Sequence, residues 1–229
     1  MISIIIPTYN EALSIGKLLK HLQKNASSEA IEIIVVDGGS KDETIAIAKQ
    51  YTMFVKLSPQ KGRAAQMNYG ASMATGEILY FIHADSIPPA SYAEDIATAV
   101  KEGYAFGRYR TKFNSNHLLL KLNAFFTRYD LFACYGGDQT LFITNELFRR
   151  IGGFKNDMRI MEDYEIVTRA KRVGRYKVMQ KAVMVSARKY DTNSWYRVQK
   201  ANYTIVQMYK HGASQQEMVE KYKQLLDYR

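Results

Sequence analysis

Short, continuously apolar segments that alternate with amphipathic stretches dominate the first hundred residues. Four of them are predicted as strands, namely SIIIP at 3–7, IEIIVVD at 31–37, MFVKL at 53–57 and EILYFIHAD at 77–85. The amphipathic stretches predict helices over 12–23, 42–51, 62–74 and 90–100. Strands that are apolar on both sides are typical of a parallel sheet covered by helices on both faces. This alternation indicates right-handed βαβ units in a doubly wound, mostly parallel α/β sheet.

After residue 100 the pattern is less regular. Strands are predicted over 103–113 and 139–144, with one or two more over 176–187, and helices over 117–128, 146–151, 163–173, 193–211 and 215–227. No internal repeat and no linker rich in Pro, Gly or Ser interrupts the chain. We therefore expect a single domain over 1–229, with a first half at 1–100, a second half at 101–190 and a helical extension at 191–229.

The charge of the chain is unevenly distributed. Residues 1–100 hold 8 Lys+Arg against 10 Asp+Glu, whereas residues 101–229 hold 24 against 12. A basic second half is compatible with nucleic acid, anionic lipid, a phosphorylated ligand or a solvated surface. The single cysteine, Cys134, excludes a disulfide framework and favours a reducing, cytoplasmic location. No apolar run predicts a transmembrane helix, and the first residues, interrupted by Pro7, do not resemble a signal peptide.

Polar residues follow three of the predicted strands where each strand ends. These segments are Pro7-Thr8-Tyr9-Asn10-Glu11, Asp37-Gly38-Gly39-Ser40 and His83-Ala84-Asp85-Ser86. Ligands of open α/β sheets bind outside the carboxyl ends of the strands. A helix cap explains any one of these residues, and the S-x-x-E spacing of Ser40 and Glu43 predicts a capping box with a helix that begins right after Gly39. Three acidic strand ends in one half of the sheet indicate a binding cleft instead.

Several common ligand motifs are absent from the sequence. No G-x-G-x-x-G follows the first strand, and no P-loop, G-x-S-x-G elbow or zinc-ligand spacing occurs. Carboxylates at strand ends without a phosphate-binding loop favour a divalent cation that bridges to a phosphorylated ligand.

Five motifs occur in a familiar order and spacing. They are IPTYNE at 6–11, VVDGGSKDET at 35–44, HADS at 83–86, GGF at 152–154 and MEDYE at 161–165. Together they resemble the family 2 glycosyltransferases of the GT-A fold over about residues 2–190. GRAAQMNYGA at 62–71, IHADS at 82–86, YGGDQTLFI at 135–143 and SAR at 186–188 are similar to one compact bacterial subfamily, encoded near radical-SAM and selenium-associated proteins.

The resemblance implies an inverting transfer of a sugar from a nucleotide-sugar, typically UDP-linked, to an acceptor hydroxyl. Residues 1–100 would bind the donor, and 101–190 would form the acceptor and catalytic half. Thr8, Tyr9 and Glu11 would border the uridine, Asp37 would accept from a base N–H, and Arg63 and Arg188 would contact the diphosphate. The full set implied for the nucleotide-sugar is Pro7, Thr8, Tyr9, Glu11, Asp37, Arg63, Ala84, Asp85 and Arg188.

Metal binding and catalysis are implied at two acidic motifs. Asp85 matches the last acid of the family's D-x-D motif and would hold Mn²⁺ or Mg²⁺. The first acid of that motif is replaced by His83, which either ligates the metal, favouring Mn²⁺, or only lines the pocket. Asp163 would be the catalytic base, and Glu162 would orient or border the acceptor, although acids also favour a helix N-terminus in general. Asp138 and Gln139 would face the sugar or acceptor.

Other interpretations stay open at this point. A sugar-phosphate nucleotidyltransferase shares a similar core, but its glycine-rich first loop is absent. No nucleic-acid-binding motif accompanies the basic half, so we expect no nucleic-acid partner. The helix at 117–128 and the basic helix from Trp195 to Tyr209 could pack on the sheet, form a homodimer or contact the inner face of an anionic membrane. The acceptor is not identified by the sequence, and a lipid-linked one would suit that last alternative.

Overall fold

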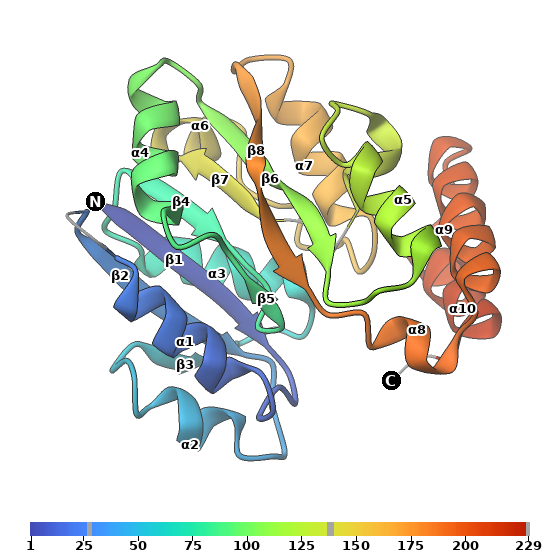
Figure 1. Cartoon of the computed structure of the whole chain (residues 1–229), viewed down its shortest axis with the longest axis horizontal. Helices are drawn as coiled ribbons and strands as arrows, with labels where there is room; N and C mark the ends of the chain where they lie inside the picture. The colour runs from blue at the N-terminus through green and yellow to red at the C-terminus, as the bar shows by residue number, and fades with distance from the viewer. Residues whose placement is uncertain (27–28, 137–139, 228–229) are drawn as a thin grey trace.

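The computed structural model describes residues 1–26, 29–136 and 140–227, and an eight-stranded sheet runs through its centre (Figure 1). The strands are β1 (Ile2–Thr8), β2 (Ile31–Asp37), β3 (Val55–Leu57), β4 (Ile78–Phe81), β5 (Ser86–Ile87), β6 (Phe106–Phe113), β7 (Leu141–Thr144) and β8 (Tyr176–Val185). The helices are α1 (Ile15–Lys24), α2 (Thr44–Ala48), α3 (Arg63–Met73), α4 (Tyr92–Lys101), α5 (Leu118–Phe126), α6 (Asn145–Arg150), α7 (Glu162–Ala170), α8 (Lys189–Thr192), α9 (Trp195–Lys210) and α10 (Gln215–Leu225), with a 3₁₀ turn at Phe132–Cys134.

The sheet is mixed, and the strand order is β3-β2-β1-β4-β7-β6-β8-β5. The strands β1 to β4 are parallel, as predicted for the first half. The strand β7 runs antiparallel to both β4 and β6, whereas β6 and β8 are parallel. The carboxyl ends of β1, β2, β4, β6 and β8 therefore lie at one edge of the sheet, together with the start of β7.

Helices cover both faces of the sheet, because side chains along each buried strand point alternately to opposite faces. On one face, Ile4 and Ile6 of β1 join a buried cluster that includes residues of α1 and α4. On the other face, Ile5 joins a cluster formed with α3, α6 and α7, into which α9 inserts Ile205. The α/β prediction is thus confirmed, including helices on both sides of an apolar sheet.

The predicted helical extension is also present, and its two long helices stand together at the right of Figure 1. Ser194 caps α9, and Ser214 forms a capping box with Glu217 at the start of α10. Val198 and Ala201 of α9 pack with Leu226 in a small buried cluster. Across the described residues, none of the helices is both long and apolar enough to span a bilayer.

One predicted helix start is wrong. The helix α2 begins at Thr44 rather than right after Gly39, and its N-cap residue Glu43 makes no side-chain capping bond. The hydroxyl of Ser40 instead donates to the carboxylate of Asp37 and accepts from the backbone N–H of Asn10. A stronger, charge-assisted hydrogen bond to Asp37 therefore replaces the predicted capping box.

Candidate functional site

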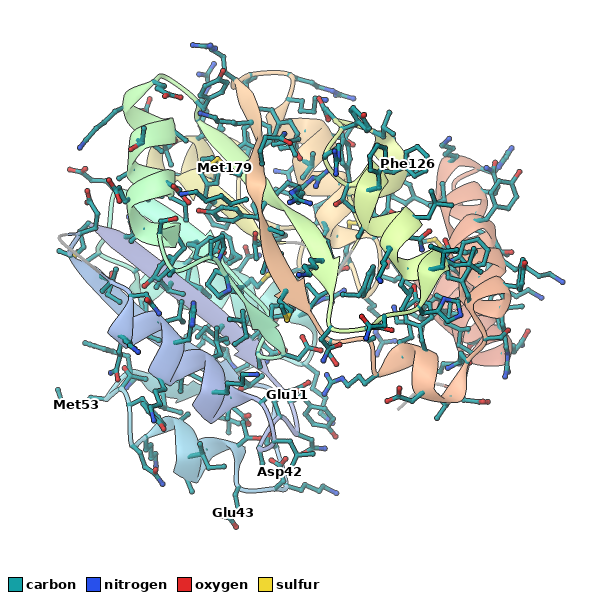
Figure 2. The ribbon with its side chains drawn as sticks, viewed as in Figure 1. Glu11, Asp42, Glu43, Met53, Phe126 and Met179 are labelled. Atoms are coloured by element: carbon teal, nitrogen blue, oxygen red, sulfur yellow. The ribbon has the colours of Figure 1, made fainter. Side chains whose placement is uncertain are left out.

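The loops that follow β1, β2, β4 and β8 meet at the edge where these parallel strands end. Glu11 comes from the first loop and lies just beyond the tip of β1 in Figure 2. Asp85 lies in the turn between β4 and β5, and Arg188 follows β8. The pairing of β5 with β8, which joins Ser86 to Val185, brings these two segments side by side. The topology therefore collects the residues that were predicted from separate motifs.

Arg188 bridges two carboxylates at this edge. Its Nη1 donates to Glu11 Oε2 at 2.9 Å, and its Nη2 pairs with the other oxygen of Glu11. The same Nη2 lies 3.3 Å from Asp85 Oδ2. The Arg188 side chain is 51% exposed, so the guanidinium is held in place while still facing solvent. The three side chains form a charged cluster that is partly exposed to solvent.

Asp37 has a different environment, because its side chain is fully buried. One carboxylate oxygen accepts from the backbone N–H groups of Gly39 and Ser40 at 2.8 and 2.7 Å. The other accepts from the hydroxyls of Thr8, at 3.0 Å, and Ser40. These four bonds fill the acceptor sites of a carboxylate. In this structure Asp37 fixes the loop after β2, and its contact with a base N–H stays a prediction.

The loops after β1 and β2 are cross-linked by side chains. The backbone N–H of Ala12 donates to Asp42, and that of Lys41 donates to Asn10 Oδ1. A hydrogen bond from the hydroxyl of Thr44 lowers the pKa of Asp42 below its ordinary value. Figure 2 shows Asp42 below Glu11 on the same side of the molecule. These bonds hold the first two loops in one fixed arrangement.

Of the other residues that the resemblance implies for the nucleotide-sugar, Pro7 and Thr8 are buried in β1, whereas Tyr9 is 56% exposed. Of these three side chains, Tyr9 is the one that faces solvent. Gln66 belongs to the motif at 62–71 but was not predicted as a site residue; it is buried on α3 and donates to the carbonyls of Thr8 and Val36 at 2.9 and 2.8 Å. Gln66 positions the ends of β1 and β2.

Arg63 and Glu162 form an ion pair between the N-termini of α3 and α7. Arg63 Nε donates to Glu162 Oε1, and the Glu162 side chain is 1% exposed. The adjacent Asp163 is only half-buried. In this structure the Glu162 carboxylate pairs with Arg63, and its role in orienting or bordering the acceptor stays a prediction. Arg63, predicted to contact a diphosphate, connects the two halves of the chain in this structure.

The remaining predicted residues belong either to the β4–β5 turn or to a segment outside the described residues. Ala84 is buried, and His83 and Asp85 are partly exposed in the β4–β5 turn. Within the ranges that the structure describes, no three His, Cys, Asp or Glu side chains gather as a metal site. A carboxylate with one neighbouring imidazole does suit a cation that takes its other ligands from substrate phosphates and water. Asp138 and Gln139 lie outside the described residues.

Comparison with known proteins agrees with this architecture. The S. aureus protein TarS 1-349, solved in complex with UDP-GlcNAc, superposes with a TM-score of 0.67 at 19% identity, over 81% of this chain and 58% of that one. The mannosyltransferase PcManGT from Pyrobaculum calidifontis, solved in complex with GDP-Man and Mn²⁺, superposes with a TM-score of 0.68 at 16% identity, over 98% and 69%. These similarities show the GT-A fold of the chain.

Sequence comparison gives the family. The chain is 28% identical over 185 residues to a PGL/p-HBAD biosynthesis glycosyltransferase of Mycobacterium bovis, which covers 72% of this chain and 67% of that protein. It is also 36% identical over 100 residues to the glycosyltransferase AglE of Haloferax volcanii, a match that spans 41% of this chain and about a third, 33%, of that relative. The family model for "Glycosyl transferase family 2" matches residues 3–161. This range includes the loops between β1 and β4, and it ends one residue before Glu162. The chain therefore belongs to glycosyl transferase family 2.

Proposed function

We propose that this protein transfers a sugar from a UDP-sugar to an acceptor hydroxyl, with inversion at the anomeric carbon. The observation that carries the proposal is the difference between two adjacent acids: Glu162 is buried against Arg63, whereas Asp163 is partly exposed at the start of α7. One acid is thus held in place, and the next is accessible to a substrate. Family membership favours this function over a nucleotidyltransferase or a nucleic-acid-binding module.

On the donor side, Arg188 is the residue suited to bind a diphosphate. A guanidinium makes strong charge-assisted hydrogen bonds with phosphate oxygens, and Arg188 already points its donors at Glu11 and Asp85. Moving those donors to a diphosphate would leave the Asp85 carboxylate able to hold Mn²⁺ or Mg²⁺, with His83 as the candidate second ligand. When bound, such a cation neutralises charge on the departing nucleotide. Two of the similar structures were solved with nucleotide-sugars, and one of these also with Mn²⁺, which supports a diphosphate and cation site here.

On the acceptor side, Asp163 would act as the general base. Its carboxylate takes the proton of the acceptor hydroxyl while the hydroxyl oxygen bonds to the anomeric carbon. The bond from that carbon to the phosphate oxygen breaks, and its electron pair leaves with the nucleotide. A single displacement of this kind converts an α-linked donor into a β-linked product. A product with a retained α-linkage would contradict the mechanism.

Substitution of Asp163 tests the proposed base. Asp163→Asn keeps the shape but cannot accept the proton, so turnover should fall by about 10²–10⁴-fold while UDP affinity and melting temperature stay near those of the wild type. The exposed Asp157 of the preceding loop gives the matched control Asp157→Asn, which should keep full turnover. Until an acceptor is found, slow release of UDP from the donor can be followed. Wild-type turnover in Asp163→Asn would remove it as the base.

Calorimetry separates the donor site from the catalytic step. UDP should bind the wild type more tightly with Mn²⁺ than with a chelator, because phosphate and metal neutralise each other's charge. Asp85→Ala should lose this difference and keep only the metal-independent binding. Equal UDP affinity in both proteins under both conditions would refute a metal-binding role for Asp85.

A further inference from the structure

The outer face of α5 and of the turn after it is apolar and exposed. Leu118, Leu122, Phe125 and Tyr129 recur at helical spacing and are 77%, 48%, 42% and 47% exposed, and Phe126 beside them is 46% exposed. The buried residues Leu120, Ala124 and Thr127 lie on the opposite side of the helix. A helix that is apolar on both faces but covered on only one is unusual for a surface helix. We call the five exposed residues the α5 stripe.

Buried hydrogen bonds attach the end of α5 and the turn after it to β6. Arg108 of β6 is 2% exposed, and it donates to the carbonyls of Thr127 and Tyr129 at 2.7 and 3.0 Å. The backbone N–H of Thr111 donates to the hydroxyl of Thr127 at 2.9 Å. Separating α5 from the sheet would leave the buried Arg108 charge without these acceptors. The exposure of the stripe is therefore a property of the packed fold.

Positive charge borders the α5 stripe. Lys121 and Arg128 lie on the same flank of the helical turn, and the guanidinium of Arg128 sits 4.0 Å above the ring of Phe125. Between Lys112 and Leu131 the sequence contains one acid, Asp130, and that carboxylate is paired with Lys171. Exposed apolar and aromatic residues next to cations are typical of helices that lie in the interface of an anionic bilayer.

We propose that the α5 stripe docks this protein on the surface of a membrane that contains anionic lipids. The charge argues against a second copy of the chain as the occupant. A two-fold dimer through α5 would bring Lys121 and Arg128 of both copies together, in a half of the chain that already holds 24 Lys+Arg against 12 Asp+Glu. Anionic headgroups neutralise the same cations, and the acyl boundary accepts the apolar side chains.

Vesicle binding of the full chain tests the proposal. The wild type should co-sediment with vesicles of phosphatidylcholine and phosphatidylglycerol in equal amounts, and much less with phosphatidylcholine alone. Leu122→Ser with Phe125→Ser should weaken binding on the order of tenfold or more, because both side chains lose their apolar surface. Lys121→Gln with Arg128→Gln should weaken it by about fivefold per charge.

A matched control uses two apolar residues that are even more exposed and lie elsewhere. Leu13 is 103% exposed and Met53 is 91% exposed, and Figure 2 shows Met53 at the opposite side of the molecule from Phe126. Leu13→Ser with Met53→Ser should bind vesicles as the wild type does, and all variants should keep the wild-type circular dichroism.

Four results would overturn the proposal. They are no binding of the wild type to anionic vesicles, equal binding to vesicles of phosphatidylcholine alone, an equal loss of binding in the control, and a wild-type dimer that Leu122→Ser with Phe125→Ser converts to monomer. The last result would assign the stripe to a second copy of the chain. None of these measurements depends on sugar transfer, so the outcome is independent of the proposed function.

Discussion

The ion pair between Arg63 and Glu162 should respond very differently to the loss of each partner. Glu162 is 1% exposed, and its second oxygen, Oε2, has no hydrogen-bond partner among the described residues. The Arg63 side chain is 37% exposed, so it is much less buried than its partner. We therefore compare Arg63→Met, Glu162→Gln and the double variant in a thermodynamic cycle.

The structure gives the expected magnitudes. Arg63→Met leaves the Glu162 carboxylate buried without the cation that pairs with it, and such a loss costs about 3–5 kcal/mol of unfolding free energy. Glu162→Gln leaves a cation that solvent can stabilise, so we expect about 1 kcal/mol. The double variant buries no charge at this position and should be more stable than Arg63→Met alone. For a chain of 229 residues, a loss of about 3 kcal/mol corresponds to roughly 6–12 °C in Tm.

Urea unfolding followed by circular dichroism measures all four proteins under one set of conditions. Lys177→Met is the control, because the Lys177 and Glu102 side chains are 28% and 50% exposed, so neither charge is buried and the pair should contribute only about 0–1 kcal/mol. If Arg63→Met and Glu162→Gln are equally destabilising, or if their effects simply add in the double variant, the burial of Glu162 does not determine the energetics of this pair and the reasoning fails.

Three further substitutions test contacts elsewhere in the fold. Asp37→Asn replaces an oxygen that accepts two hydrogen bonds with an NH₂ donor, so we expect a loss of about 1–3 kcal/mol in urea unfolding. Gly107→Ala would place a Cβ 2.3 Å from the carbonyl oxygen of Lys177, and the β6–β8 pairing should weaken by about 1–3 kcal/mol; an unchanged Tm would contradict this. Burial raises the pKa of Glu165, but hydrogen bonding and charge from Arg169 lower it by more, to below its ordinary 4.5. This stabilisation is present above pH 4.5 and lost as the pH falls through the lowered pKa, so Glu165→Gln should flatten the acid limb of the stability profile.

The first half of the fold follows from the sequence because its strands are buried on both faces and separated by amphipathic helices. The direction of β7 does not follow from the sequence, since the short run at 141–144 is compatible with a parallel or an antiparallel neighbour. The two-residue strand β5 is too short to leave any periodic signal. Pairing with distant strands decides the direction of each: β7 pairs with β4 and β6, and β5 pairs with β8.

The sequence predicted where the candidate residues lie in the sheet, but not which of them pair with one another. The acids that follow the strands were predicted to lie at one edge of the sheet, and they do, because parallel strands place their carboxyl ends together. The partners of Arg188 and Arg63 could not be derived, since Glu11 and Glu162 lie far from them in the sequence. A local pattern also failed at Ser40. Its spacing to Glu43 predicted a capping box, but its hydroxyl donates to the carboxylate of Asp37, a residue that the capping pattern does not include.

The pairing of β5 with β8 has a consequence for the order of folding. The strands β1 to β4 pair within the first 81 residues, so they can assemble while the remainder of the chain is still unstructured. The turn that carries Asp85 is fixed only when Ser86 meets Val185, after most of the chain has closed on itself. Contacts of such long sequence separation form late, because loop closure must precede them. A chain interrupted before β8 would therefore hold a formed parallel sheet whose Asp85 and Arg188 segments had not yet met.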